Sequence, residues 1–234
     1  MTTLPVAEAF VSIQGEGKLA GVPSWFLRLA GCNLRCRWCD TPYASWSPQG
    51  RPVPLDALLE QAKASGQRHV VLTGGEPMIF PAVQALASGL TQLGMHVTIE
   101  TAGTVYRPVR CDLLSLSPKL ASSTPVADRR DPDGRWARLH EQRRLDLAAL
   151  QRLLDEHPDR QVKFVVASQE DLHEVGAIVQ ALDGLAPQDV MLMPEGTAPH
   201  PPGRLDWLVA ACIRHGWRYC HRVHIDLFGN QPGT

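Results

Sequence analysis

The sequence predicts an α/β fold, a partial and distorted (β/α) barrel. Short apolar runs rich in β-branched residues alternate with amphipathic stretches along the chain, a pattern typical of parallel strands joined by crossover helices. The number of strand-like runs suits an incomplete barrel better than a full eightfold one. With 234 residues, 44% of them hydrophobic, the chain is long enough to bury one large core.

Eight stretches are expected to be strands because they are short, apolar and rich in β-branched residues. They cover residues 6–13, 25–31, 69–75, 96–103, 111–118, 161–168, 189–196 and 219–228. Ligands of a (β/α) barrel bind at the carboxyl ends of its strands. We therefore expect the functional residues to follow these runs.

Five amphipathic stretches are expected to be helices. They cover residues 55–65, 81–93, 143–157, 171–184 and 203–216. The segment of about residues 118–142 is charged and contains proline, and we expect a long irregular loop there, either a lid or a partner surface. No internal repeat is present, so we expect a single domain over residues 1–234 with a cysteine-rich loop at 31–41.

The charge pattern argues against two classes of partner. The formal net charge is −1. We interpret the Lys and Arg residues as scattered along the chain rather than clustered, which predicts no direct nucleic-acid or membrane binding. The chain has no apolar run long enough to span a bilayer, and its start lacks the features of a signal peptide. We expect a cytoplasmic protein that acts on a small molecule.

The stretch "GCNLRCRWCDT" places Cys32, Cys36 and Cys39 in a C-x3-C-x2-C spacing directly after a predicted strand. In a reducing compartment such a group indicates metal or redox chemistry rather than disulfides. Structural zinc is normally closed by four ligands, and Asp40 is poorly placed to be the fourth. A cubane iron–sulfur cluster held by three cysteines keeps one iron free for another molecule. Cys111, Cys212 and Cys220 lie apart and are expected to be ordinary buried cysteines.

A second motif, "TGGEP", ends the predicted strand at 69–75. Gly74 and Gly75 allow the backbone to approach a ligand closely, and Glu76 offers a carboxylate to an ammonium group. Alone this turn would be ordinary. Together with the cysteine loop it indicates a ligand site that includes the free iron.

These two motifs resemble the radical S-adenosylmethionine (SAM) family. The resemblance implies a [4Fe-4S] cluster held by Cys32, Cys36 and Cys39, whose free iron binds SAM, and one-electron cleavage to a 5′-deoxyadenosyl radical. It places the methionine amine at Gly75 and Glu76, and the adenine against Trp38. Further SAM contacts are expected from the residues around Cys39 and from two later strand ends: Cys39, Asp40, Ser117, Pro118, Lys119, Met193, Pro194 and Glu195. The family more often has Gln-Pro where this chain has "MPE".

Within that family, "SIQGEG", "ETAGT", "SPK" and "RVHIDLFGNQPGT" are similar to segments of the 7-carboxy-7-deazaguanine synthases. The similarity implies a lyase of queuosine (7-deazapurine) biosynthesis, on the route to tRNA modification. It would convert 6-carboxy-5,6,7,8-tetrahydropterin to 7-carboxy-7-deazaguanine with release of ammonia. Mg²⁺ is implied as a further cofactor, and flavodoxin or ferredoxin as electron donor. A homodimer is expected because an incomplete barrel exposes a sheet edge.

Several residues suit the substrate of such an enzyme. Ile13, Gln14 and Gly15 offer backbone groups and an amide to the amino-pyrimidinone edge of a pterin. Arg28 can clamp a carboxylate with two parallel hydrogen bonds. Glu16 is a candidate proton acceptor or substrate anchor.

Three further side chains complete the predicted site. Thr73 is expected to contact the substrate. His224 shares a strand face with Arg222 in the predicted arrangement, where the two close the cavity or pair with each other. Thr41 is the expected ligand of Mg²⁺, an ion that takes few protein ligands and keeps waters and substrate oxygens. For Arg28 and Thr41 the alternatives are a solvated edge arginine and a turn cap before Pro42.

Two other functions fit parts of this pattern. A glycyl-radical activase shares the cysteine loop and the Gly-Gly-Glu-Pro turn, but a protein substrate would not require "SIQGEG", Arg28 or Thr41. A non-catalytic iron–sulfur electron carrier, or a zinc-stabilised binding module, would leave the polar strand ends without a use.

Overall fold

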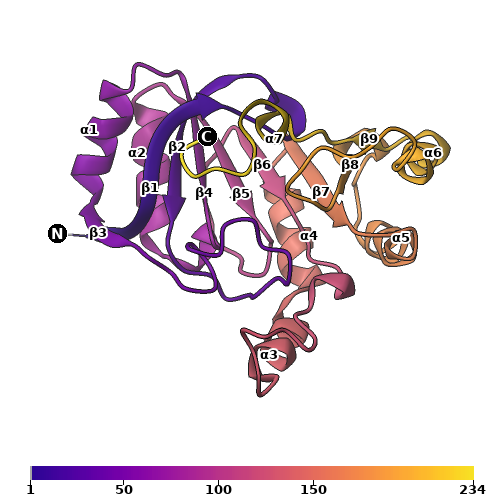
Figure 1. Cartoon of the computed structure of the whole chain (residues 1–234). Helices are drawn as coiled ribbons and strands as arrows, with labels where there is room; N and C mark the ends of the chain where they lie inside the picture. The colour runs from indigo at the N-terminus through magenta and orange to yellow at the C-terminus, as the bar shows by residue number, and fades with distance from the viewer. Residues whose placement is uncertain (1) are drawn as a thin grey trace.

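The structure is a computed structural model that describes residues 2–234 (Figure 1). Nine strands form one sheet: β1 (Thr3–Ile13), β2 (Pro23–Leu29), β3 (Arg51–Pro54), β4 (His69–Gly74), β5 (His96–Thr101), β6 (Leu113–Leu116), β7 (Arg160–Val166), β8 (Val190–Pro194) and β9 (Arg218–Tyr219). Seven α-helices accompany them: α1 (Leu55–Ala64), α2 (Ala82–Gln92), α3 (Arg135–Arg143), α4 (Leu147–Glu156), α5 (Asp171–Ala181), α6 (Asp206–His215) and α7 (Val223–Phe228).

The strand order is β3-β1-β2-β4-β5-β6-β7-β8-β9. From β2 to β9 every neighbouring pair is parallel, whereas β1 runs antiparallel to both β2 and β3. The two ends of this order, β3 and β9, are not paired with each other, so the barrel is open. The predicted fold class, a partial and distorted (β/α) barrel, is confirmed.

The core lies between the sheet and the helices that follow its strands. Leu72, Ile99 and Phe164 are fully buried and belong to one hydrophobic core with residues of the helices. Along the strands, polar side chains alternate with these apolar ones, as Glu100 and Lys163 do beside Ile99 and Phe164. The polar face of the strands therefore points into the barrel.

The five predicted helices are confirmed with small shifts of their ends. The largest shift is in α4, which begins at Leu147 rather than at residue 143. Asp146 caps this helix by accepting a hydrogen bond from Ala149 N at 2.9 Å. In residues 2–234 the structure contains no helix with the length and apolar character needed to span a bilayer.

The strand predicted at 219–228 is wrong. Only Arg218–Tyr219 pairs with the sheet, as β9, and Val223–Phe228 forms the short helix α7. In this stretch Ile225 is buried, but Leu227 and Phe228 are exposed, so the apolar residues do not share one buried strand face. Gly229 adopts a positive φ of 71° and ends the helix.

The irregular loop predicted over about 118–142 is also wrong in part, because this stretch contains a 3-10 turn at Ala121–Ser123 and the helix α3. Gly134, with φ 64°, precedes the helix, and both oxygens of the buried Asp131 accept hydrogen bonds from its first turn, from Trp136 N and Ala137 N. In Figure 1 α3 projects from the body of the barrel.

Both ends of the sheet are short. The edge strand β3 has the sequence RPVP, with Pro52 and Pro54 among its four residues, and β9 has only two residues. No strand was predicted at β3. Its prolines are compatible with the edge position, because proline lacks a ladder donor and is confined to the edges of sheets.

Candidate active site

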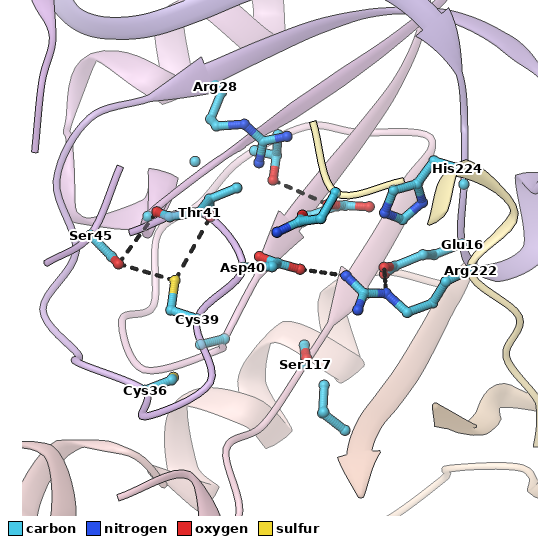
Figure 2. A pocket seen from close by; sticks show the side chains of 18 of the residues that line it. Glu16, Arg28, Cys36, Cys39, Asp40, Thr41, Ser45, Ser117, Arg222 and His224 are labelled. Atoms are coloured by element: carbon cyan, nitrogen blue, oxygen red, sulfur yellow. Dashed lines mark hydrogen bonds and ion pairs between the residues drawn. The ribbon is translucent and has the colours of Figure 1, made fainter. Parts of the chain in front are cut away.

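A cavity of about 450 Å³ lies at the carboxyl ends of the parallel strands. Its wall combines the cysteine loop, the ends of the central strands and the start of α7 (Figure 2). This volume lies in the usual range for a small-molecule site. The predicted functional residues that line it are Ile13, Gln14, Gly15, Glu16, Arg28, Cys32, Cys36, Trp38, Cys39, Asp40, Thr41, Thr73, Gly75, Ser117, Lys119, Met193 and His224.

The cysteine loop presents all three of its thiols to this cavity. The Sγ of Cys32 accepts a hydrogen bond from Leu34 N at 3.4 Å, and the Sγ of Cys39 lies 3.1 Å from Ser45 Oγ. Burial raises the pKa of both Cys32 and Cys36 to about 12. A positively charged centre is therefore needed to keep them as thiolates at neutral pH.

This donor set fits an iron–sulfur cluster. Three soft thiol ligands face one cavity, and each ligand of a cubane binds a different iron, so the sulfurs need not converge on one point. Among residues 2–234, no three His, Cys, Asp or Glu side chains surround the position of a single metal ion.

The Gly-Gly-Glu-Pro turn packs directly against the cysteine loop. Gly75 N donates to Leu29 O at 3.0 Å, and Glu76 N donates to Gly31 O at 2.9 Å. A Cβ on Gly75 would lie 2.3 Å from Gly31 O and 2.7 Å from the Cβ of Cys32. Only glycine fits here, because the two backbones that enclose the cofactor position approach so closely.

The carboxylate of Glu76 does not face the cavity, contrary to the expectation that it meets an ammonium group. It is fully buried and accepts hydrogen bonds from Thr101 Oγ1 at 2.6 Å, Ala102 N at 2.7 Å and Met78 N at 3.0 Å. Burial raises its pKa above the ordinary value. Glu76 therefore ties the turn to the end of β5, and Gly74 and Gly75 line the cavity beside it.

On the opposite wall, Glu16 forms a charged network with Lys163 and Arg222, and Arg222 connects it to Asp40 of the cysteine loop. Figure 2 shows Glu16, Arg222 and Asp40 of this network. Lys163 pairs with one carboxylate oxygen of Glu16, and Arg222 Nε lies 3.1 Å from the other. Arg222 also pairs with Asp40. Burial alone would raise the pKa of Glu16, but the charges of Lys163 and Arg222 lower it to about 2. Glu16 is therefore held ionised.

Glu100 accepts hydrogen bonds from two predicted substrate residues. Its Oε1 accepts from Gln14 Nε2 at 3.2 Å, and its Oε2 accepts from Thr73 Oγ1 at 3.1 Å. The amide oxygen of Gln14 accepts from Glu16 N at 3.2 Å. The side-chain amide of Gln14 thus connects Glu100 to the backbone at Glu16. The carboxylate of Glu100 lines this part of the cavity wall.

Arg28 reaches the cavity from β2. Its Nε donates to Glu8 Oε1 at 2.6 Å, and Tyr43 Oη donates to the same oxygen at 2.6 Å. Glu8 on the neighbouring strand therefore orients the guanidinium through its Nε and leaves the Nη edge for another partner. The two parallel donors needed for a carboxylate are then available.

Gly15 and His224 fit closely together. Gly15 O accepts a hydrogen bond from Val223 N at 2.9 Å, and a Cβ on Gly15 would lie only 1.9 Å from His224 Nδ1. His224 and Arg222 reach the cavity from the start of α7, not from a strand face as predicted. Burial lowers the pKa of His224, which favours the neutral imidazole.

Besides Glu76, three predicted contacts lie outside the cavity wall, namely Pro118, Pro194 and Glu195. Both prolines are buried, and Glu195 N donates to Val166 O at 2.9 Å. Of the remaining cysteines, Cys212 and Cys220 are buried and Cys111 is half-buried. The Sγ of Cys220 accepts a hydrogen bond from Gly17 N at 3.2 Å.

Sequence reasoning missed Lys163 and the residues after α7. A lysine in the middle of the apolar strand "QVKFVV" is a usable signal, because a buried lysine needs an acidic partner. Asn230, Gln231, Pro232 and Thr234 belong to the family-like segment "RVHIDLFGNQPGT", but no site role was predicted for them, and the structure has them on the cavity wall.

Comparison with known proteins gives concordant results. The sequence pattern of the Radical SAM superfamily matches residues 27–121. A 7-carboxy-7-deazaguanine synthase of Rhodopirellula baltica is 47% identical over 237 aligned residues, which cover 100% of this chain and 90% of that protein. A protein of the same name from Halobacterium salinarum is 42% identical over 99% of this chain and 93% of its own length. The crystal structure of QueE from Escherichia coli is similar with a TM-score of 0.70 and 26% identity, over 95% of each chain.

Proposed function

Because this chain belongs to the 7-carboxy-7-deazaguanine synthases, a family of radical SAM enzymes, we propose that it converts 6-carboxy-5,6,7,8-tetrahydropterin to 7-carboxy-7-deazaguanine and ammonia. Family membership makes it an enzyme whose cofactors are a [4Fe-4S] cluster and SAM. The observation that carries the proposal is a single cavity of about 450 Å³ that joins three cysteine thiols to the charged residues of the opposite wall.

The arrangement of the residues that line the cavity supports a cofactor side. Cys32, Cys36 and Cys39 would hold the cluster, with Gly75 beside them. Trp38, Asp40, Ser117, Lys119 and Met193 line the space where SAM would lie. When bound, the cluster and SAM supply a 5′-deoxyadenosyl radical by one-electron cleavage. The protein orients the substrate towards that side and excludes water.

The substrate side offers complementary groups for a carboxylated pterin. The Nη edge of Arg28 can clamp the 6-carboxylate, since Glu8 already holds its Nε at 2.6 Å. The Glu100 carboxylate can accept from the amino group and ring N–H of the pyrimidinone, beside Gln14 and Thr73. The two ends of the substrate are then fixed by opposite charges.

Glu16 suits an anchoring role better than a proton-accepting one. A carboxylate whose pKa is lowered to about 2 by Lys163 and Arg222 is a weak base at neutral pH. His224, whose pKa burial lowers, is neutral and lies on the same wall, and it is the better placed proton acceptor.

Mg²⁺ is part of the proposal through Thr41. Its hydroxyl lines the cavity 3.8 Å from Cys39 Sγ, and Figure 2 shows it on the same side as Ser45. A neutral hydroxyl is a weak ligand, so the ion would be held mainly by waters and by the substrate carboxylate. Substrate and Mg²⁺ should then strengthen each other's binding.

The reaction is tested with anaerobically reconstituted enzyme, SAM, dithionite and the carboxylated pterin. We expect 7-carboxy-7-deazaguanine by mass spectrometry and one ammonia for each product. A tetrahydropterin that lacks the 6-carboxyl group is the matched control, and it should give no ring contraction. SAM cleavage without any deazapurine from the carboxylated substrate would contradict the proposal.

The metal is tested in the same assay with and without Mg²⁺. We expect Mg²⁺ to tighten the carboxylated pterin and not SAM, and Thr41→Ala to reduce this effect while iron content and basal SAM cleavage stay at the parent level. If the parent's substrate binding and turnover are independent of Mg²⁺, Thr41 is only a turn residue.

The proposal also covers the localisation, oligomeric state and electron donor of the enzyme. We expect a cytoplasmic homodimer whose cluster is reduced by flavodoxin or ferredoxin. Light scattering of the reconstituted protein measures the oligomeric state directly, and a monomer at micromolar concentration would contradict that part.

A further inference from the structure

Residues 121–143 cover the outer side of the cysteine loop, away from the cavity. Three alternate residues of that loop are bound by this segment through hydrogen bonds. Asn33 O accepts from Arg143 Nη1 at 3.5 Å, Arg35 N donates to His140 Nδ1 at 3.1 Å, and Arg37 N donates to Ser123 O at 2.9 Å. The cluster loop and its cover therefore form one contiguous surface.

Residues 121–143 are anchored to the cysteine loop by buried contacts. His140 is fully buried, and its Nε2 lies 2.8 Å from Ser123 Oγ. Arg35 stacks on the Trp136 ring at 3.9 Å. Such contacts hold the backbone of this segment in one arrangement against the cysteine loop.

Five arginines that we call the arginine face are exposed on this surface: Arg37, Arg129, Arg135, Arg138 and Arg143. Within residues 2–234 none of the five takes part in an ion pair. The expectation that basic residues are scattered is therefore wrong for this part of the chain. In a protein of net charge −1, such a group creates a local positive field.

The acidic residues of the same segment largely serve other contacts. Asp128 is held by Arg130 at 2.6 Å, and the buried Asp131 caps α3. Glu141 pairs with Arg144 at 2.8 Å and accepts from Thr124 Oγ1 at 2.7 Å. Asp133 accepts a hydrogen bond from Arg135 N at 3.1 Å and is exposed. The exposed unpaired charge of the surface is thus strongly positive.

At Arg37 the protein surface lies close to the cysteine that would bind the cluster. This exposed residue follows Cys36 directly, and its carbonyl accepts from Arg130 Nη2 at 2.8 Å. Trp46 Nε1 donates to Cys36 O at 2.9 Å, and the guanidinium of Arg130 lies 4.0 Å from the Trp46 ring. Solvent therefore lies one residue away from a cluster ligand, whereas the cavity side would be filled by cofactor and substrate.

We propose that the arginine face docks an acidic one-electron carrier protein of the flavodoxin or ferredoxin kind, and that its electron enters the cluster past Arg37. The proposal rests on the proposed function in that it takes the reductant to be such a protein. The carrier is oxidised by one electron and the cluster is reduced by one. Redox encounters of this kind use small interfaces in which charge complementarity sets the association rate.

A charge-reversal variant tests the docking surface. Arg129→Glu, Arg135→Glu and Arg138→Glu together change three exposed residues that touch neither cavity nor cysteines. The matched control reverses three exposed charges elsewhere, with Lys63→Glu, Arg110→Glu and Arg214→Glu. The holoenzymes are mixed with flavodoxin hydroquinone in a stopped-flow instrument, and the cluster absorbance is followed. Binding of oxidised flavodoxin is measured separately by calorimetry.

We expect the triple variant to be reduced about ten- to a hundredfold more slowly than the parent at low ionic strength, with weaker flavodoxin binding. Added salt should slow the parent and not the variant. Reduction of the variant at the parent rate, or equal slowing of the control, would overturn the proposal.

Two further measurements distinguish a docking defect from a catalytic defect and from nucleic-acid binding. SAM cleavage driven by dithionite should be the same in all three proteins, and its absence from the parent would mean failure of the proposed function rather than of the docking surface. If the triple variant loses binding to bulk tRNA but is reduced by flavodoxin as fast as the parent, the face is a nucleic-acid surface and the proposal is wrong.

Discussion

The two walls of the cavity are built by different means. On the cofactor wall, backbone hydrogen bonds join the cysteine loop to the turn of Gly75, and glycine permits their close approach. On the substrate wall, side-chain charges meet from distant parts of the chain, since Glu16 is 147 residues from Lys163 and 206 from Arg222. The first wall depends on the close approach of two backbone segments, and the second on buried charge.

This difference predicts different responses to mutation. A buried ion network has already lost its hydration, so removal of one member leaves an uncompensated charge that is costly. A backbone-built loop loses a ligand without such a charge being left behind. Changes on the cofactor wall should therefore affect chemistry more than folding, and changes on the substrate wall should affect both.

The largest expected effect is that of Cys36→Ala. Turnover and SAM cleavage should be abolished, because a thiol that lines the cavity is lost, while the thermal unfolding of the apo-protein should change little. Iron analysis and calorimetry measure the two parts. Cys212→Ala, on α6, is the control and should keep the iron of the parent. An active Cys36→Ala protein would remove the basis for the cofactor wall.

The next effect is that of Lys163→Met. It leaves Glu16 buried with Arg222 alone, and we expect a loss of about 3–5 kcal/mol in the free energy of unfolding. Urea unfolding measures this loss. Lys18→Met removes a more exposed lysine that pairs with Asp159 at 3.1 Å and Asp189 at 2.9 Å, and it should cost about 1 kcal/mol or less. If both variants lose the same free energy of unfolding, the buried network contributes no more to stability than a surface ion pair.

A smaller effect is expected for Gly15→Ala. The new methyl group would lie 1.9 Å from His224 Nδ1, so the start of α7 must move, at a cost of about 1–3 kcal/mol. The KM for the carboxylated pterin should rise while iron content is unchanged. Gly176→Ala on α5 has no heavy atom within 4 Å of its new Cβ and should be neutral or stabilising. Parent-like stability and KM in Gly15→Ala would show that the contact is easily relieved.

The smallest effect concerns pH. The pKa of Glu16 is about 2 in the folded protein and 4.5 ordinarily, so its stabilising contribution is complete above pH 4.5 and is lost as pH falls towards 2. Between about pH 5.5 and about pH 3.5 the apo-protein should lose about 1 kcal/mol through this group. Most of that loss should be missing from Lys163→Met. Parallel stability curves for the two proteins would show that Lys163 does not hold Glu16 ionised.

The same contrast explains how far the sequence predicts the site. Cys32, Cys36, Cys39 and the Gly-Gly-Glu-Pro turn are contiguous motifs, and they lie where the pattern of strands placed them. The partnership of Glu16 with Lys163 depends on which strands become neighbours of the Glu16 loop, and no spacing in the chain encodes that. The one indication in the sequence is Lys163, a lysine within the apolar run "QVKFVV", which needs an acidic partner.

The two wrong elements have local causes. In "VHIDLF" the short apolar pattern fits either a strand or a short helix. The structure has a helix here, and Gly229 with its positive φ ends it. In the stretch of α3, buried Asp131 and His140 act as a cap and an anchor, although polar residues in a charged segment suggest a loop. The arginine face follows from this fold, because α3 gathers residues that a loop would leave dispersed.

The short edges of the sheet bear on self-association. An open barrel has two strands with unpaired backbone groups, and long exposed edges of this kind invite intermolecular β-pairing and aggregation. Here β3 carries two prolines in four residues, and β9 has only two residues. Neither edge offers a ladder of donors to another chain. The homodimer proposed for this protein must therefore form through helices or loops rather than through a continuous intersubunit sheet.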